Sequence, residues 1–176
     1  LYLRNSIFIT IFLLFFAILA AGLYTNTKEI QSPLIGQQIP IFNLPNLNSG
    51  STLTNKSLPN EPYLINVWAS WCLECIKEHN YLKNIQNINI KIIGINYKDT
   101  RNDALGWLGI YGNPYQFSIF DENGSLGLEM GVYGVPETFI IDTNGVIIDK
   151  FVGALNENDI RTKIIPQMLN TNSNKN

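Results

Sequence analysis

A compact apolar run, a turn that carries two cysteines and a helix-periodic stretch follow one another near the middle of this 176-residue chain. The run Tyr63–Trp68 is apolar apart from Asn66, and its length is typical of a buried strand. From Cys72 onwards, apolar residues recur at helical spacing up to Ile88. The chain is therefore constrained to a strand, a tight turn and a helix, with both cysteines where the helix begins.

The rest of the chain alternates between strand and helix patterns. We expect further strands at residues 90–95, 116–120, 137–141 and 146–152, and helices at residues 103–108 and 156–169. Asn144-Gly145 favours a hairpin turn between the last two strands, and Asn156 is suited to cap the closing helix. Residues 40–59, rich in Pro, Asn and Ser, indicate irregular chain with a short hairpin. This order predicts an α/β fold, with a mixed central sheet flanked by helices.

Cys72 and Cys75 are the only cysteines in the sequence. A bridge across two intervening residues closes almost no loop and adds little stability, so the pair indicates chemistry. At a helix N-terminus, unpaired N–H groups and the helix dipole favour a thiolate, which makes Cys72 the expected nucleophile. Cys75 lies one turn further along the same face, where its thiol can resolve a mixed disulfide formed by Cys72.

A zinc or haem site is an alternative interpretation of a Cys-x-x-Cys pair. Zinc normally takes four protein ligands, whereas this chain has one histidine, His79, and no second cysteine pair. We therefore expect redox chemistry with no metal and no other cofactor. Two other hypotheses stay open, a copper or haem chaperone that uses both cysteines and His79, and a non-catalytic scaffold. A lone histidine, however, is more often a packing or surface residue than a ligand.

The segment Ile7–Leu23 is almost wholly apolar and has about the length that a helix needs to cross a bilayer. Arg4 and the terminal amine precede it, so the positive-inside tendency places residues 1–6 in the cytoplasm and the rest of the chain beyond the membrane. A cleaved signal peptide is the alternative, because Ala20-Ala21-Gly22 could serve a peptidase. Both interpretations export the domain.

We expect a cytoplasmic N-terminus at residues 1–6, a transmembrane anchor at 7–24, a linker at 25–33, one globular domain at 34–170 and a disordered tail at 171–176. The globular part is long enough to bury a substantial core. The formal net charge of −2 and the 15% of charged residues are ordinary for a folded protein and supply no basic stripe. Nucleic acid is therefore not an expected partner.

A proline precedes an apolar strand in the run Gly131–Phe139. Within a strand ladder a trans proline would break the pairing, so a cis bond before Pro136 is one interpretation. A plain turn before the strand would explain the proline equally well.

The Trp-Cys-x-x-Cys after one strand and the Val-Pro before a later one make the chain similar to the thioredoxin superfamily. Within it, the chain resembles the DsbE (CcmG) type of cytochrome c biogenesis thioredoxin over nearly its whole length. The resemblance rests on five runs: Asn66–Cys72, Glu78-His79, Gly94–Asp99, Gly112–Tyr115 and Gly131–Asp142. It implies a thioredoxin-like fold with an N-terminal extension, in which residues 100–131 are the family's central insertion.

The resemblance also implies a periplasmic protein, anchored in the inner membrane, that keeps the haem-binding Cys-x-x-Cys-His of apocytochrome c reduced. Its implied partners are other cytochrome c maturation proteins and a membrane thiol-disulfide electron donor. The closest alternative is a general extracytoplasmic reductase, or an oxidant of the same fold. The family usually has proline after the first cysteine, whereas this chain has Leu73-Glu74. Negative charge from Glu74 near the sulfurs argues against a strong oxidant.

Site residues can be carried over from the resemblance. Pro136 would be the cis-proline beside the sulfurs, and Val135 would offer its backbone to an extended substrate segment. Glu78 and Glu137 match the family's acidic residues near the active site, where an acid can disfavour a thiolate or relay its proton, chiefly at Cys75. The alternative for both acids is a solvent-exposed position.

Two more residues complete the expected site. Trp71 should form a wall of the active site and Tyr133 should line the substrate groove, whereas Trp68 should be packing. Thioredoxin carries a buried acid six residues before its first cysteine, where this chain has Asn66. Proton handling is therefore expected to fall on Glu78 or Glu137.

Overall fold

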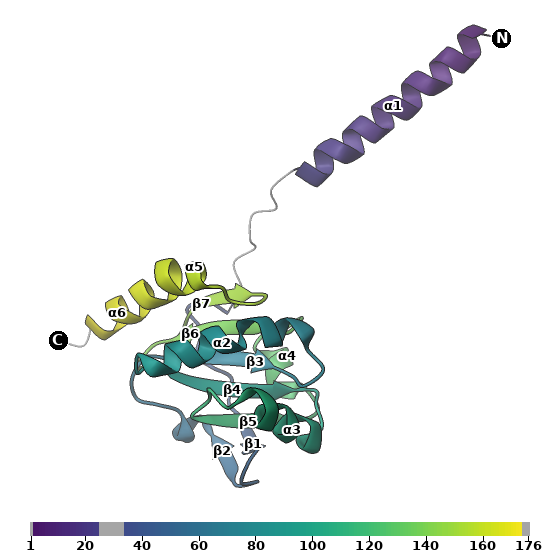
Figure 1. Cartoon of the computed structure of the whole chain (residues 1–176). Coiled ribbons are helices and arrows are strands. Elements are labelled where there is room, and N and C mark those ends of the chain that lie inside the picture. The colour runs from purple at the N-terminus through teal and green to yellow at the C-terminus, as the bar shows by residue number, and fades with distance from the viewer. Residues whose placement is uncertain (1, 25–33, 174–176) are drawn as a thin grey trace. The chain divides into compact units, whose positions relative to one another are not determined.

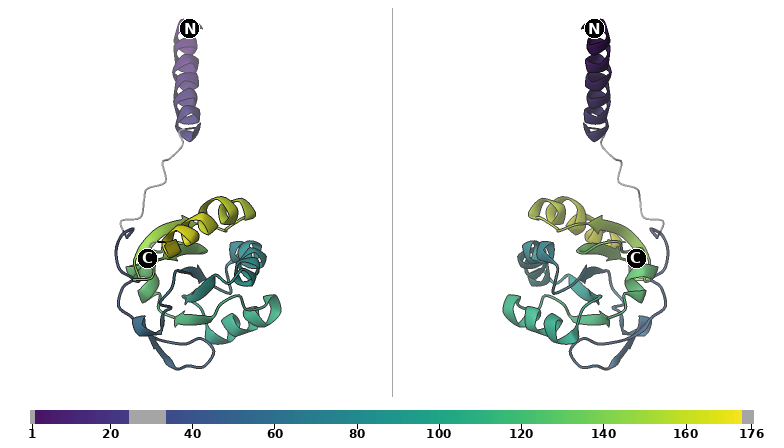
Figure 2. Two further views of the ribbon diagram at one scale, coloured as in Figure 1. Left: turned by 90° about the vertical axis from the view of Figure 1, so that its left-hand side faces the viewer. Right: turned by 90° about the vertical axis from the view of Figure 1, so that its right-hand side faces the viewer.

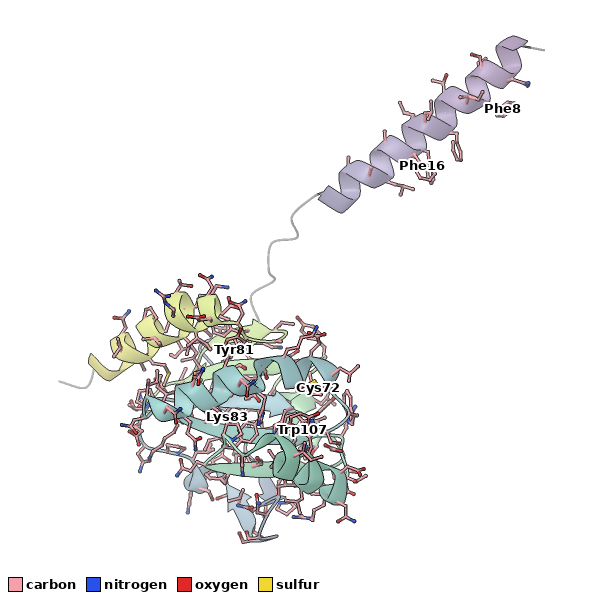
Figure 3. The ribbon with its side chains drawn as sticks, in the orientation of Figure 1. Phe8, Phe16, Cys72, Tyr81, Lys83 and Trp107 are labelled. Carbon is pink, nitrogen blue, oxygen red and sulfur yellow. A yellow bond between two sulfur atoms is a disulfide. The ribbon has the colours of Figure 1, made fainter. Side chains whose placement is uncertain are left out.

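The computed structural model describes residues 2–24 and 34–173 and divides into two units, the N-terminal helix and a domain that holds the other described residues. Helix α1, Tyr2–Tyr24, is long and apolar enough to cross a membrane, over the stretch Asn5–Gly22. Its apolar side chains are exposed, and Phe8 and Phe16 project from the ribbon in Figure 3. The expected linker at residues 25–33 and the side chain of Arg4 lie outside the described residues.

The domain is built on one five-stranded sheet of order β5-β4-β3-β6-β7 (Figure 1). The strands are β3 Tyr63–Trp68, β4 Lys91–Tyr97, β5 Phe117–Asp121, β6 Glu137–Ile141 and β7 Ile147–Val152. Strands β3, β4 and β5 are parallel, whereas β6 and β7 run antiparallel to their neighbours, so the sheet is mixed as expected. Val67 pairs with both Ile95 and Glu137, which places the end of β3 between the end of β4 and the start of β6.

Both faces of the sheet are covered. Helices α2, Leu73–Asn87, and α3, Arg101–Tyr111, lie on the same side of the sheet in Figure 2 and pack on Leu64 and Trp68. The opposite face, with Ile65 and Val67, packs against α4, Ser125–Glu129, and against residues 39–58. That second segment holds a small hairpin of β1, Asn43–Pro45, and β2, Thr52–Thr54, followed by the 3₁₀ turn η1, Asn55–Ser57. Every residue of β3 is buried because the sheet is covered on both sides.

The expected strands, and the expected helices at residues 72–88 and 103–108, are confirmed, with bounds that shift by up to three residues. Helix α4 was not expected, because it has only five residues, follows Gly124 and contains Gly127. It is held by the buried Asp121 carboxylate, which accepts hydrogen bonds from the N–H groups of Leu126 and Gly127. A single charged group thus stabilises a helix too short to form alone.

The closing helix is interrupted where one continuous helix was expected. It consists of α5, Glu157–Asp159, a π-helical turn η2, Ile160–Ile164, and α6, Ile165–Ser173, with Asn156 as the expected N-cap. Pro166 explains the interruption, because proline has no N–H to donate to the carbonyl four residues earlier. The helix also continues to Ser173, so the expected disorder is wrong for residues 171–173, where the Thr171 hydroxyl donates to the Gln167 carbonyl. Residues 174–176 lie outside the described residues.

Candidate active site

The two cysteines stand where β3 gives way to α2, at the end of the sheet (Figure 3). Cys72 is the N-cap of α2, its N–H donates to the Ala69 carbonyl at 3.2 Å, and its Sγ accepts from the Cys75 N–H at 3.0 Å. Cys72 and Cys75 form a disulfide, so the structure is that of the oxidised protein. The Cys75 N–H of the first helical turn therefore points at the Cys72 sulfur, which lies at the positive end of the helix dipole.

The disulfide is buried, whereas the apolar side chains on either side of Cys72 in the sequence are exposed. Cys72 and Cys75 are only 4% and 2% exposed, whereas the neighbouring Trp71 and Leu73 are 57% and 77% exposed. The indole N–H of Trp71 donates to the Lys98 carbonyl at 2.9 Å, so this exposed ring is held in place. A partner large enough to cover both exposed side chains would approach the sulfurs across them.

Trp68 is fully buried, and the expectation that it packs in the core is confirmed. Its ring stacks on Tyr115 with centroids 5.4 Å apart and lies 5.1 Å from the ring of Trp107 in α3. This aromatic cluster lies between the sheet and the helices, directly before the turn that carries the cysteines.

Glu78 and Glu137 are both fully buried, so the alternative of solvent-exposed positions is wrong. One carboxylate oxygen of Glu78 accepts from Asn66 Nδ2 at 2.8 Å and the other from the Leu155 N–H at 2.9 Å. Asn66 in turn accepts from the Tyr115 hydroxyl at 2.8 Å. The residue that stands in place of thioredoxin's buried acid is thus hydrogen-bonded to an acid on the helix.

Burial raises the pKa of Glu78 from an ordinary 4.5 to about 7, and the hydrogen bonds from Leu155 and Asn66 oppose the rise. Burial, with a smaller effect of the Glu78 charge, also raises the pKa of Tyr115 well above its ordinary value, so its hydroxyl stays protonated and donates. Glu78 lies three residues after Cys75 on the buried face of α2. A carboxyl group that titrates near pH 7 in this position can give or take a proton under physiological conditions.

Glu137 is bound differently, in a buried ion pair. Its carboxylate lies 2.8 Å from Lys150 Nζ, and the lysine side chain is only 5% exposed. The other Glu137 oxygen accepts from the Tyr133 N–H at 3.2 Å, and Lys150 donates to the Gly131 carbonyl at 2.8 Å and lies over the Tyr133 ring. The pair therefore binds the backbone of the loop Gly131–Pro136 at two points, Gly131 and Tyr133.

That loop reaches the same end of the sheet as the cysteine turn, because Glu137 pairs with Val67 near the end of β3. The peptide bond between Val135 and Pro136 is cis, which answers the question that the sequence left open. Tyr133 is 76% exposed, while Val135 packs against both faces of the core. Within residues 34–173, neither the N–H nor the carbonyl of Val135 has a hydrogen-bond partner.

His79 packs in the core and does not face the sulfurs as a ligand would. Its Nε2–H donates to the Gly112 carbonyl at 2.9 Å, its ring meets the Trp107 ring edge-on, and burial lowers its pKa. Among residues 2–24 and 34–173, no three His, Cys, Asp or Glu side chains are grouped to hold a metal ion. The copper or haem chaperone hypothesis thus finds no support in the position of His79.

Asp99 was not singled out from the sequence beyond its place in a matching run, yet it lies against the cysteine turn. Its buried carboxylate accepts from the N–H and the hydroxyl of Ser70, two residues before Cys72, and also from Asn96 and Thr100. Its position in the sequence could have indicated this role. Asp99 closely follows β4, whose end lies beside the end of β3, and the carboxyl ends of parallel strands commonly form a site.

The comparisons with known proteins agree with this geometry. The sequence model of the Redoxin family matches residues 34–164. The thiol:disulfide interchange protein DsbE of Pseudomonas fluorescens is 48% identical over 149 residues, covering 85% of this chain and 84% of that protein. DsbE of Vibrio cholerae is 44% identical over 161 residues, 88% of each chain. A thio-disulfide isomerase from Thermus thermophilus, 23% identical, shares the fold with a TM-score of 0.65 over 78% of this chain and 96% of its own.

Proposed function

This chain belongs to the Redoxin family and, within it, to the DsbE thiol:disulfide interchange proteins, and we propose that it reduces the haem-binding cysteines of apocytochrome c during cytochrome c maturation. It is a thiol-disulfide oxidoreductase of thioredoxin-like fold. The observation that carries the proposal is the Cys72–Cys75 pair at the N-terminus of α2, in a chain nearly half identical to a DsbE protein.

The reaction begins from the reduced pair. The Cys72 thiolate attacks one sulfur of the substrate disulfide, which forms a mixed disulfide and releases a substrate thiolate. Cys75, deprotonated, then attacks the Cys72 sulfur, which closes the disulfide seen here and releases the second substrate thiolate. Two electrons pass to the substrate, whose two thiolates take up protons. A membrane dithiol donor must then return two electrons to Cys72 and Cys75.

Glu78 is the residue to which we assign proton transfer. Cys75 is 2% exposed, so its proton must leave through the protein or through a narrow opening. Glu78 is one helical turn away on the same buried face and titrates near pH 7, so it can accept that proton when Cys75 attacks. Glu137 has a lysine partner and we assign it a positioning role in the Gly131–Pro136 loop.

The substrate site consists of Trp71, Tyr133, Val135 and Pro136. An extended substrate segment can pair with the free backbone groups of Val135 as a short added strand. Such a site recognises the backbone of the substrate more than its side chains. The exposed rings of Trp71 and Tyr133 supply apolar contact on either side.

For the location, α1 supports an anchor in the inner membrane with the domain on the periplasmic side. An anchored domain would meet apocytochrome c, other maturation proteins and the electron donor at the membrane surface.

A trapping experiment tests the function. Cys75→Ser, expressed in the native host, should accumulate as a mixed disulfide through Cys72, and mass spectrometry of non-reducing gel bands identifies the attached protein. Apocytochrome c or a maturation protein is the expected adduct, and the double variant Cys72→Ser/Cys75→Ser should capture nothing. A broad mixture of exported proteins would instead show a general reductase, and the absence of any adduct would contradict Cys72 as nucleophile.

A further inference from the structure

Lys98 and Asp99 bind the turn that precedes the catalytic cysteine, through the Lys98 carbonyl and the Asp99 carboxylate. Both carboxylate oxygens of Asp99 accept two hydrogen bonds each. Two of these four come from Ser70, from its N–H at 2.6 Å and from its hydroxyl at 2.7 Å. The carboxylate thus joins β4 and the start of α3 to the cysteine turn.

Lys98 fixes the next residue of that turn. Its carbonyl accepts from the indole N–H of Trp71 at 2.9 Å, while its own N–H donates to the Asp121 carbonyl at 3.0 Å. Lys98 has a φ of +48°, in the left-handed region that residues other than glycine seldom occupy. A backbone held in this region, with its neighbours tied on both sides, is a feature that clusters at functional sites.

The two residues held by Lys98 and Asp99 lie directly before the catalytic cysteine in the chain. Ser70 and Trp71 immediately precede Cys72, and the Trp71 ring is 57% exposed although it is hydrogen-bonded. An exposed tryptophan that is not held can adopt several rotamers, and a partner would have to order it on binding. Here the ring is ordered before the partner arrives.

We propose that Asp99 is a positioning residue for partner binding: with the Lys98 carbonyl, it holds Ser70 and Trp71 as a rigid wall beside the Cys72 sulfur. This inference rests on the proposed function, since it concerns how the same site receives a disulfide-bearing polypeptide. The proposal distinguishes two reactions of the Cys72 thiolate, with a small reagent and with a polypeptide disulfide. Attack on a small reagent requires only the Cys72 thiolate, whereas attack on a polypeptide requires the wall as well.

The test compares these two steps in the full-length reduced protein in detergent. The first readout is the rate of reduction of an oxidised Cys-x-x-Cys-His peptide, and the second is the rate of Cys72 alkylation by iodoacetamide at the same pH. The ratio of the two rates cancels any change in thiolate content. For Asp99→Ala the ratio should fall about tenfold, chiefly through KM, since binding must then order two side chains.

Two further variants sharpen the comparison. Ser70→Ala removes only the hydroxyl bond to Asp99, and its ratio should fall roughly twofold to threefold. Asp142→Ala is the matched control, because the Asp142 carboxylate also accepts two backbone N–H groups, from Asn144 and Val146, but in the β6–β7 turn at the opposite end of the sheet. Its ratio should be unchanged even where its stability falls.

An unchanged ratio in folded Asp99→Ala overturns the inference. If circular dichroism shows that this variant does not fold, Ser70→Ala decides, and an unchanged ratio there overturns it equally. Failure of the proposed function looks different: the wild-type protein would reduce the haem-motif peptide no faster than a control disulfide peptide without that motif. The ratio measured with the control peptide would still test the role of Asp99.

Discussion

At the scale of single residues, Glu78 is a buried acid whose protonation changes the stability of the folded state. Its carboxyl group is fully buried, and the pKa is about 7 in the folded protein against an ordinary 4.5. The folded protein therefore holds this proton more tightly than the unfolded chain does. By linkage, the stabilising effect is complete below about pH 4.5 and is lost as the pH rises through about 7.

We predict that the oxidised wild-type protein loses about 3 kcal/mol of unfolding free energy through Glu78 between pH 4.5 and pH 8. Glu78→Gln should lack this loss, so the two stability curves should converge or cross as the pH rises. Urea unfolding at several pH values measures it. Glu129→Gln is the control, because Glu129 is exposed on α4 and its substitution should leave the pH dependence as in the wild type. Parallel curves for wild type and Glu78→Gln would contradict the assignment.

The residues of the site differ in how far the sequence could predict them. Cys72 and Cys75 follow from spacing and from the strand before them. The burial of Glu78 also had a signal, because it lies on the same helical stripe as Cys75, Leu82 and Ile85. The pairing of Lys150 with Glu137 had no signal in the sequence. The two side chains lie together only because of the register of the β6–β7 hairpin, which contains an irregularity between Ile140 and Ile141. Long-range pairing of this kind is decided by tertiary structure.

At the scale of elements, the Gly131–Pro136 loop depends on one buried ion pair. Glu137 accepts from the loop backbone at Tyr133, and Lys150 donates to it at Gly131. Two charges buried together stabilise little in net terms, but the removal of one leaves the other without a partner.

We predict that Lys150→Met destabilises the domain by about 3–5 kcal/mol at neutral pH, because the Glu137 carboxylate is then buried alone. The double variant Glu137→Gln/Lys150→Met should recover most of that loss. Urea unfolding of the four proteins in the cycle measures the coupling. Lys91→Met is the matched control, since Lys91 pairs with Glu61 on the surface and its loss should cost less than about 1 kcal/mol. A similar cost for both lysines would contradict the role of the buried pair.

The elements themselves were largely predictable, and the exceptions have local causes. Strand β3 is an apolar run interrupted only by Asn66, β6 ends in the apolar run Phe139–Ile141, and the Asn144-Gly145 turn fixes the last hairpin. Helix α4 was not predictable from the local sequence pattern, because it depends on hydrogen bonds to the Asp121 carboxylate. The interruption at η2 could have been predicted, because Pro166 lies inside the helical pattern and lacks the donor that a regular turn requires.

At the scale of the whole molecule, the chain joins two units whose surfaces suit different surroundings, lipid for one and water for the other. The large apolar side chains of α1 from Ile7 to Leu19 are exposed, a surface that is stable in lipid rather than in water. The domain buries its own apolar residues in two clusters, one on each face of the sheet. The family match begins at residue 34, after the first unit has ended.

We predict that a chain beginning at residue 34 folds alone, with the same urea midpoint as the full-length protein in detergent and the same rate of peptide-disulfide reduction. Flotation with lipid vesicles should retain the full-length chain and lose the shortened one. Leu13→Arg/Phe16→Arg in the full-length chain is the control, since each arginine near the centre of α1 opposes insertion by about 3 kcal/mol and should abolish flotation while the domain stays active.

The same helix allows the two interpretations of the leader to be separated in the native host. An anchor leaves α1 on the protein, so the purified chain should keep residues 7–24 and resist carbonate extraction from membranes. Cleavage after the small residues Ala20-Ala21-Gly22 would give a chain that starts beyond them and is released with the soluble fraction. Mass spectrometry of the N-terminus distinguishes the two, and because both export the domain, either result leaves the chemistry of Cys72 and Cys75 on the same side of the membrane.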